Sequence, residues 1–124
     1  MSLLIMLLAF GCGVAMAMEY KVGDNNGWTI EAPINCSQWA SDKTFFIGDI
    51  LHFEYQPSKD DVMEVSEEDF QQCNKEKPIG IYRSGSDKIL LKRAGYYFFI
   101  TTASNHCNDG LKLSIKVNNA PPIP

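Results

Sequence analysis

Hydrophobic and polar residues alternate with a period of two in several segments of the chain. The clearest segment is 111–117, in which four aliphatic residues alternate with Lys, Ser and Lys. Residues 51–55 repeat the pattern, with Leu51, Phe53 and Tyr55 on one face. Because successive side chains of a strand point to opposite faces, both segments are predicted to be half-buried strands.

Further strands are expected where short apolar runs lie between turn-forming sequences. The uncharged aromatic run 96–101 is typical of a central strand, and shorter strands are predicted at 20–22, 62–65 and 89–91. Sequences rich in Gly, Asn, Asp and Ser separate these runs, at 23–27, 47–49, 84–87, 94–95 and 108–110. Short strands at this spacing predict an all-β sandwich or barrel.

Helical segments are predicted to be few and short. One helix is expected at 67–72, because Ser66 is a favourable N-cap and three acids occupy the first turn, where the helix dipole favours negative charge. A second helical turn is expected around 37–40.

The two ends of the chain differ in composition from its middle. Residues 2–17 carry no charge and end in Ala15-Met16-Ala17, the small-x-small form of a signal-peptidase site. A transmembrane anchor is the main alternative, but the run is shorter than the roughly 20 residues that a spanning helix needs. The predicted organisation is therefore a signal peptide at 1–17, one domain at 18–118 and a Pro-rich tail at 119–124, typical of the start of a linker.

Composition limits the chain to a single domain with an acidic balance. The chain has 124 residues with a formal net charge of −4, and its bases do not cluster. A size of this order supports one hydrophobic core. General nucleic-acid binding is not expected, since it requires a concentrated Lys/Arg surface.

The cysteines predict one disulfide and one unpaired thiol. Cys12 would leave with the signal peptide, so Cys36, Cys73 and Cys107 would remain in an oxidising compartment. The residues alone do not decide which two are paired. No Cys-x-x-Cys pair exists, and neighbouring His106 and Cys107 would point to opposite sides of an extended segment, so a zinc site is not expected.

Several motifs, in order along the chain, resemble the plant phytocyanins. They are Val22-Gly23-Asp24, Gly27-Trp28, Trp39-Ala40, Ile47-Gly48-Asp49-Ile50-Leu51, Val62-Met63-Glu64-Val65, Gly95-Tyr96-Tyr97-Phe98 and His106-Cys107. The resemblance implies a cupredoxin-like Greek-key β-sandwich of about seven to eight strands with one or two short helices. It also implies a disulfide between Cys73 and Cys107, which leaves Cys36 as the spare thiol.

The family's copper-ligand pattern falls on residues that are mostly unsuited to copper. A blue-copper centre uses two imidazoles, a thiolate and a weak axial donor. The corresponding positions here are Asp60, Thr101, His106 and Leu111, of which only His106 is kept. This departure resembles the early nodulin-like branch of the phytocyanins, and it predicts a degenerate site that binds no metal.

The resemblance implies a non-catalytic extracellular module. Its expected partner is a cell-wall glycan, a glycoprotein or a surface receptor, and a monomer is expected. A blue-copper one-electron carrier is the alternative, and an enzyme is not expected because no hydrolase or phosphate-binding motif is present. The protein is predicted to be secreted, or to sit on the outer face of the plasma membrane if the full form continues into an anchor.

Three other features have ordinary structural interpretations. Asn35-Cys36-Ser37 is a nominal glycosylation sequon, with an unmodified loop Asn as the alternative. His52 is interpreted as a sheet-face histidine. An acidic cluster is interpreted as a solvated helix start, with a surface for a basic partner as the alternative; its members are Asp60, Asp61, Glu64, Glu67, Glu68 and Asp69.

Overall fold

A computed structural model describes residues 17–119 of the protein. The predicted signal peptide and Pro-rich tail lie almost entirely outside this range. The described residues form eight strands, two short α-helices and one 3-10 turn. The elements are β1 (Glu19–Lys21), η1 (Asp24–Asn26), α2 (Cys36–Ala40), β2 (Phe45–Phe46), β3 (Ile50–Glu54), β4 (Val62–Val65), α3 (Glu67–Gln72), β5 (Gly80–Tyr82), β6 (Ser86–Leu90), β7 (Gly95–Ile100) and β8 (Lys112–Asn118).

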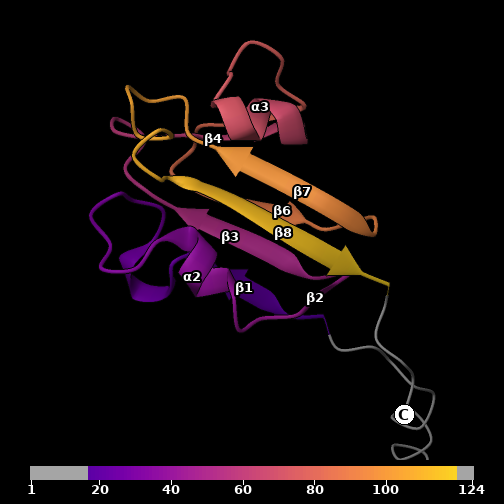
Figure 1. Ribbon diagram of the computed structural model, residues 1–124. Helices are drawn as coiled ribbons and strands as arrows, with labels where there is room; N and C mark the ends of the chain where they lie inside the picture. Colours follow the sequence, from indigo (N-terminus) through magenta and orange to yellow (C-terminus); the bar gives the residue numbers. More distant parts are fainter. Residues whose placement is uncertain (1–16, 120–124) are drawn as a thin grey trace, which may run out of the picture.

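The strands form two sheets, which confirms the expected all-β sandwich. One sheet has three strands in the order β1-β3-β6, and the other has five in the order β2-β8-β7-β4-β5. Two pairings, β1 with β3 and β2 with β8, are parallel, and the rest are antiparallel. Figure 1 shows α2 and α3 on different sides of the sandwich, with α3 next to the end of β7.

The main core lies between the two sheets, on the faces that the alternating pattern predicted. Leu51 and Phe53 of β3 are completely buried, as is Leu113 of β8. The ring of Phe53 contacts Trp28 edge-on at a centroid distance of 5.0 Å and Phe99 at 5.2 Å. These large aromatic rings supply much of the apolar area that the small domain buries.

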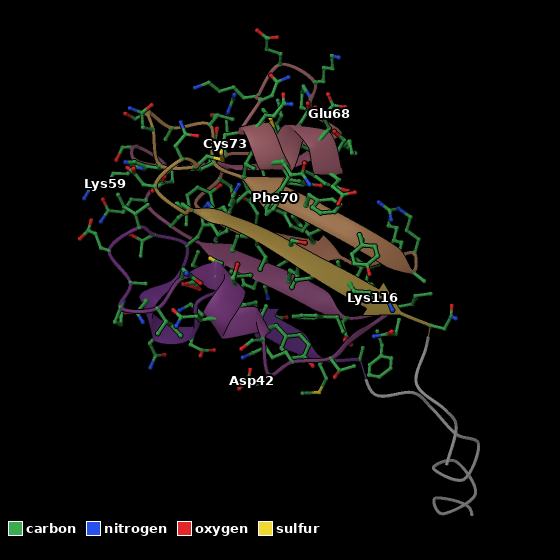
Figure 2. All side chains as sticks on the ribbon, viewed as in Figure 1. Asp42, Lys59, Glu68, Phe70, Cys73 and Lys116 are labelled. Atoms are coloured by element: carbon green, nitrogen blue, oxygen red, sulfur yellow. A yellow bond between two sulfur atoms is a disulfide. The ribbon has the colours of Figure 1, made fainter. Side chains whose placement is uncertain are left out.

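A second apolar cluster lies on the outer face of the five-stranded sheet, beneath α3. Met63 and Val65 of β4 and Ile100 of β7 belong to it, and Phe70 packs against them from α3 (Figure 2). All four residues of β4 are consequently buried. The helix begins as predicted, with the Ser66 hydroxyl accepting a hydrogen bond from the Asp69 amide at 3.2 Å.

The sequence patterns did not predict every strand. β2 and β5 were not expected, because strands of two and three residues are too short to show a period. β6 begins at Ser86, although residues 84–87 read as a turn and a strand was expected only at 89–91. Its polar first residues are held by pairing with β3, where Asp87 lies opposite Phe53.

Among residues 17–119, no helix has the length and apolarity that crossing a membrane requires.

Candidate functional site

The four positions of the copper-ligand pattern come from three segments that meet at one end of the sandwich. Asp60 precedes β4, Thr101 directly follows β7, and His106 and Leu111 lie between β7 and β8. β4 pairs antiparallel with β7, with Met63 opposite Ile100, so the start of β4 lies beside the end of β7. This pairing carries Asp60 to Thr101.

Asp60, Thr101 and His106 form one hydrogen-bonded group. Asp60 Oδ1 accepts a hydrogen bond from Thr101 Oγ1 at 3.1 Å and is hydrogen bonded to His106 Nδ1 at 2.7 Å. The side chain of Asp60 is 6% exposed and that of His106 is 25% exposed. A buried carboxylate therefore engages the imidazole nitrogen that faces the site. Such charge-assisted hydrogen bonds are stronger than neutral ones.

Leu111 does not join this group through its side chain. The side chain is 2% exposed and belongs to the main core between the sheets. Its backbone amide donates to the carbonyl oxygen of His106 at 2.9 Å, which closes the loop around the histidine.

Asp61, which the sequence analysis placed only in the acidic cluster, is a further part of the site. Its carboxylate accepts hydrogen bonds from the Thr102 amide at 2.7 Å and from the Thr102 hydroxyl at 2.5 Å, and Arg83 Nε lies 3.4 Å away. Its carbonyl oxygen accepts a hydrogen bond from Trp28 Nε1 at 2.8 Å. The sequence signals for this role were its membership of the acidic cluster and its place beside Asp60, just before a predicted strand. Asp61 anchors the segment after β7 to the segment before β4.

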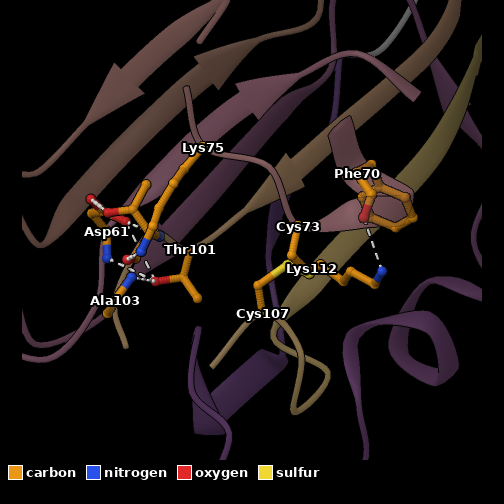
Figure 3. The surroundings of a disulfide bond; sticks show 9 residues. Asp61, Phe70, Cys73, Lys75, Thr101, Ala103, Cys107 and Lys112 are labelled. Carbon is orange, nitrogen blue, oxygen red and sulfur yellow. Dashed lines mark hydrogen bonds between the residues drawn. A yellow bond between two sulfur atoms is a disulfide. The ribbon is translucent and has the colours of Figure 1, made fainter. Parts of the chain in front are cut away.

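A disulfide joins Cys73 to Cys107 next to this group (Figure 3). The Cα atoms are 5.9 Å apart, within the usual range for a disulfide. Cys73 is the C-cap of α3, and Cys107 follows His106. The pairing is the one that the resemblance implies, and it ties α3 to the loop that carries the histidine.

His106 and Cys107 do not lie in an extended segment, so the expectation that they point to opposite sides of one does not apply to them. The loop is a series of turns in which the amides of His106 and Gly110 donate to the carbonyl oxygens of Ala103 and Cys107, at 3.1 and 3.0 Å. The turns arise because this segment connects two neighbouring strands of one sheet and must reverse direction.

Cys36 and Asn35 lie at the start of α2, away from this loop in sequence. Cys36 is the free cysteine of the described residues and is 5% exposed, and burial raises the pKa of its thiol to about 12. Asn35 is exposed and is the N-cap of α2, where its side-chain oxygen accepts from the Gln38 amide at 2.8 Å.

The predicted acidic cluster does not form one solvated surface. Glu67 and Glu68 are exposed as expected, but Asp69 is 7% exposed and accepts a hydrogen bond from Asn74 at 3.2 Å. Glu64 is 8% exposed and lies 3.5 Å from Arg93. Burial raises the pKa of Glu64, and the Arg93 guanidinium partly offsets this. Asp60 and Asp61 are likewise buried, so most of the cluster faces inward.

His52 lies on the outer face of the three-stranded sheet, as interpreted from the alternation. Its ring is flanked by carboxylate oxygens of Glu19 at 3.6 Å and Glu54 at 3.5 Å, and its Nε2 is 2.9 Å from the Ser86 hydroxyl.

The donor atoms at the His106 site do not fit a blue-copper ion. They comprise one imidazole, one carboxylate and one hydroxyl, whereas a blue-copper site requires a thiolate and a second imidazole. Within residues 17–119, no three or more His, Cys, Asp and Glu side chains are grouped so as to hold a metal ion.

Comparison with known proteins agrees with the fold and with the order of the motifs. The family model of the plastocyanin-like domain matches residues 28–111. The chain belongs to this family. Its sequence relatives and structural neighbours are phytocyanins, and the resemblance and the cupredoxin-like fold inferred from the motifs are thereby confirmed.

The relatives include proteins named for copper and proteins named otherwise. The chain is 42% identical to a blue copper protein of Arabidopsis thaliana over 90% of its length, and 34% identical to early nodulin-like protein 3 of the same plant over 91%. It spans 58% and 57% of the length of these two relatives. The Cu2+ structure of cucumber stellacyanin matches with a TM-score of 0.77 at 34% identity, over 86% of this phytocyanin and 99% of stellacyanin.

Proposed function

We propose that this phytocyanin is an extracellular, non-catalytic binding module whose copper site is degenerate. The observation that carries the proposal is the hydrogen bond of 2.7 Å between the Asp60 carboxylate and His106 Nδ1. The one imidazole that is retained from the ligand pattern thus has the Asp60 carboxylate as its hydrogen-bond partner.

The other two positions of the pattern support the same proposal. The hydroxyl of Thr101 is neutral and hydrogen bonds to Asp60, so it does not replace a thiolate. The Leu111 side chain has no lone pair and lies in the apolar core. Cys107 is held in the disulfide, and a bridged sulfur is not a thiolate ligand.

A blue-copper electron carrier is the second candidate function. It is favoured by the similarity to a blue copper protein at 42% identity, which exceeds the 34% to early nodulin-like protein 3. Overall identity and the ligand positions therefore point in different directions. The chemistry of the site depends on the ligand positions, since donor type decides whether copper binds and which potential it adopts.

Titration of the purified, disulfide-bonded protein with Cu(II) separates the two functions. We expect no intense visible absorption band from thiolate-to-copper charge transfer and no stoichiometric copper after dialysis. An intense blue band in the wild-type protein would establish the electron carrier instead.

A reciprocal variant tests whether the site has been assigned to the right residues. Asp60→His, Thr101→Cys and Leu111→Gln together restore two imidazoles, a thiolate and an axial donor around the intact His106 loop. The triple variant is expected to turn blue with Cu(II), whereas the variant lacking Thr101→Cys stays colourless. A folded triple variant that remains colourless would show that these positions do not converge as a metal site.

The partner that we propose is a cell-wall glycan, a glycoprotein or a surface receptor, encountered outside the cell. An enzymatic role is not proposed: the hydrogen bond between His52 and Ser86 lies on the outer face of the three-stranded sheet, where Ser86 is exposed, and His106 is hydrogen bonded to the Asp60 carboxylate. Retention of wall components on the immobilised protein supports the binding role. Failure to retain any wall component or surface glycoprotein would contradict it.

A further inference from the structure

A groove of about 560 Å³ lies beside the degenerate site. Its walls come from η1 and the loop after it, from the ends of β1 and β3, and from the segment before β4. A volume between about 300 and 1,000 Å³ is typical of small-ligand sites. Figure 2 shows Lys59 on this side of the molecule, beside the purple segment that follows η1. The groove is defined by its lining residues: Lys21, Asn25, Asn26, Gly27, Trp28, Thr29, Glu31, Glu54, Tyr55, Gln56, Lys59 and Asp60.

The charged residues of the groove are matched with opposite charges. Lys21 Nζ lies 3.2 Å from a Glu54 carboxylate oxygen, and Lys59 Nζ lies 3.8 Å from Glu31 Oε1. The remaining acid, Asp60, is engaged by His106. The groove therefore presents no cluster of one sign, and long-range attraction for an ionic ligand is weak.

The groove also contains side-chain amides that are available to hydrogen bond to a ligand. The side chains of Asn25, Asn26 and Gln56 are exposed there, and they take no part in the side-chain hydrogen bonds formed by Trp28 and Tyr55 in the same walls. Each amide offers two donor hydrogens and an acceptor oxygen. A sugar hydroxyl likewise donates and accepts, so sugar hydroxyls are suitable hydrogen-bonding partners for these amides.

The walls of the groove are held in place before any ligand arrives. The Trp28 amide donates to the Glu54 carbonyl at 2.9 Å, and Trp28 Nε1 donates to the Asp61 carbonyl at 2.8 Å. Gly27 has φ of 74°, and a Cβ placed there would come within 2.7 Å of the Glu54 carbonyl oxygen. Only glycine allows this close approach. A site that is ordered in advance loses less entropy on binding.

We infer that this groove binds a segment of an uncharged polysaccharide through the amides of Asn25, Asn26 and Gln56. The inference rests on the proposed binding function and specifies its ligand class and its location. The paired charges flank the ligand and contribute hydrogen bonds, and they disfavour a strongly anionic chain because each lysine already has a carboxylate partner.

The test is a titration of the disulfide-bonded protein with soluble oligosaccharides, followed by calorimetry and by amide NMR shifts. The probes are neutral gluco-oligosaccharides, neutral xyloglucan fragments and anionic oligogalacturonides. We expect a neutral probe to bind with shifts confined to residues of the groove. The variant Asn26→Ala with Gln56→Ala is expected to lower the affinity at least tenfold.

A matched variant removes two exposed amides elsewhere. Gln72→Ala with Asn108→Ala alters the C-terminal end of α3 and the loop after Cys107, outside the groove lining. It is expected to keep the affinity within twofold. Circular dichroism and the urea midpoint of each variant show whether the fold is retained.

Other results would overturn the inference in separable ways. Tighter binding of oligogalacturonide, weakened by salt, would mean an anionic ligand. Binding only to glycans still attached to protein would replace the polysaccharide with a glycoprotein. If the wild type and the groove variant retain the same wall component equally, the protein is a binding module, but the groove is not its binding site. If neither protein retains any wall component, both the groove inference and the proposed binding function are contradicted.

Discussion

Both histidines of this phytocyanin lie beside carboxylates, but in different environments. At the His106 end, Asp60 is 6% exposed and hydrogen bonds to the imidazole at 2.7 Å. On the outer face of the three-stranded sheet, His52 lies 3.5 to 3.6 Å from Glu19 and Glu54, whose side chains are 43% and 42% exposed. The contrast lies in the carboxylates: a buried Asp60 is hydrogen bonded to the imidazole in one place, and two partly exposed glutamates lie beside the imidazole in the other.

The difference is what the proposed function requires, since a degenerate copper end would have to be held together by protein groups. Exposed ion pairs contribute little to stability, whereas a buried polar group that loses its partner costs about 1 to 3 kcal/mol. The Asp60 group joins the start of β4 to the end of β7 and to the His106 loop. Hydrogen bonds among protein groups thus connect the segments whose residues would bind the metal in a copper protein.

The largest expected effect comes from the disulfide that borders the His106 end. Cys73→Ser with Cys107→Ser opens a loop with a sequence separation of 34 residues. Chain-entropy reasoning gives a loss of roughly 3 to 4 kcal/mol in the free energy of unfolding. Urea denaturation measures it, and Cys36→Ala, which keeps the bridge, is the control. A loss no larger than that of Cys36→Ala would mean that the bridge does not hold this end.

An intermediate effect is expected from breaking the buried group itself. Asp60→Ala removes the carboxylate partner of the His106 ring and one of the two acceptors of the Thr101 hydroxyl, and it should cost about 1 to 3 kcal/mol. Glu54→Ala, beside His52, should cost less than about 1 kcal/mol. Both are compared through their urea midpoints at equal m-values. Equal losses would contradict the contrast between the two regions.

The smallest expected effect is a pH dependence from Glu64 on β4. Burial raises its pKa above the ordinary value of 4.5, so the folded protein retains this proton to a higher pH than the unfolded chain does. Its contribution to stability is fully present below pH 4.5 and is lost as pH rises through the folded pKa. Glu64→Gln should flatten this part of the stability curve, measured by denaturation between pH 4 and about 7. Glu54→Gln is the matched exposed substitution, and an unchanged slope in Glu64→Gln would assign the dependence to another group.

The longer elements of the fold could be predicted because their burial follows a period. Residues 111–117 and 51–55 each show one buried face, and β4 matches its predicted bounds of 62–65. β2 and β5 could not be predicted, since each exists only through pairing with a longer strand, β8 or β4. The start of β6 was hidden for another reason: Ser86 and Asp87 are turn-forming residues, and cross-strand pairing outweighs that preference.

The sequence predicted where the site residues lie, but not which hydrogen bonds they form. The family pattern placed Asp60, Thr101 and His106 at one end of the sandwich, and their side chains do meet there. Nothing in the sequence indicated that Asp60 would turn inward and bond to both partners, since the cluster of six acids to which it belongs suggested a solvated surface. The groove could not be predicted from the sequence either, because its walls come from segments that are far apart along the chain.

The burial of Cys36 bears on how the protein matures. With a thiol pKa of about 12, almost none of this sulfur is deprotonated at neutral pH, and only the thiolate attacks a disulfide. Once α2 has packed into the core, the buried Cys36 thiol is a poor nucleophile towards the Cys73–Cys107 disulfide. Scrambled isomers would then be confined to the period before folding, and the folded protein would resist covalent dimerisation through this residue.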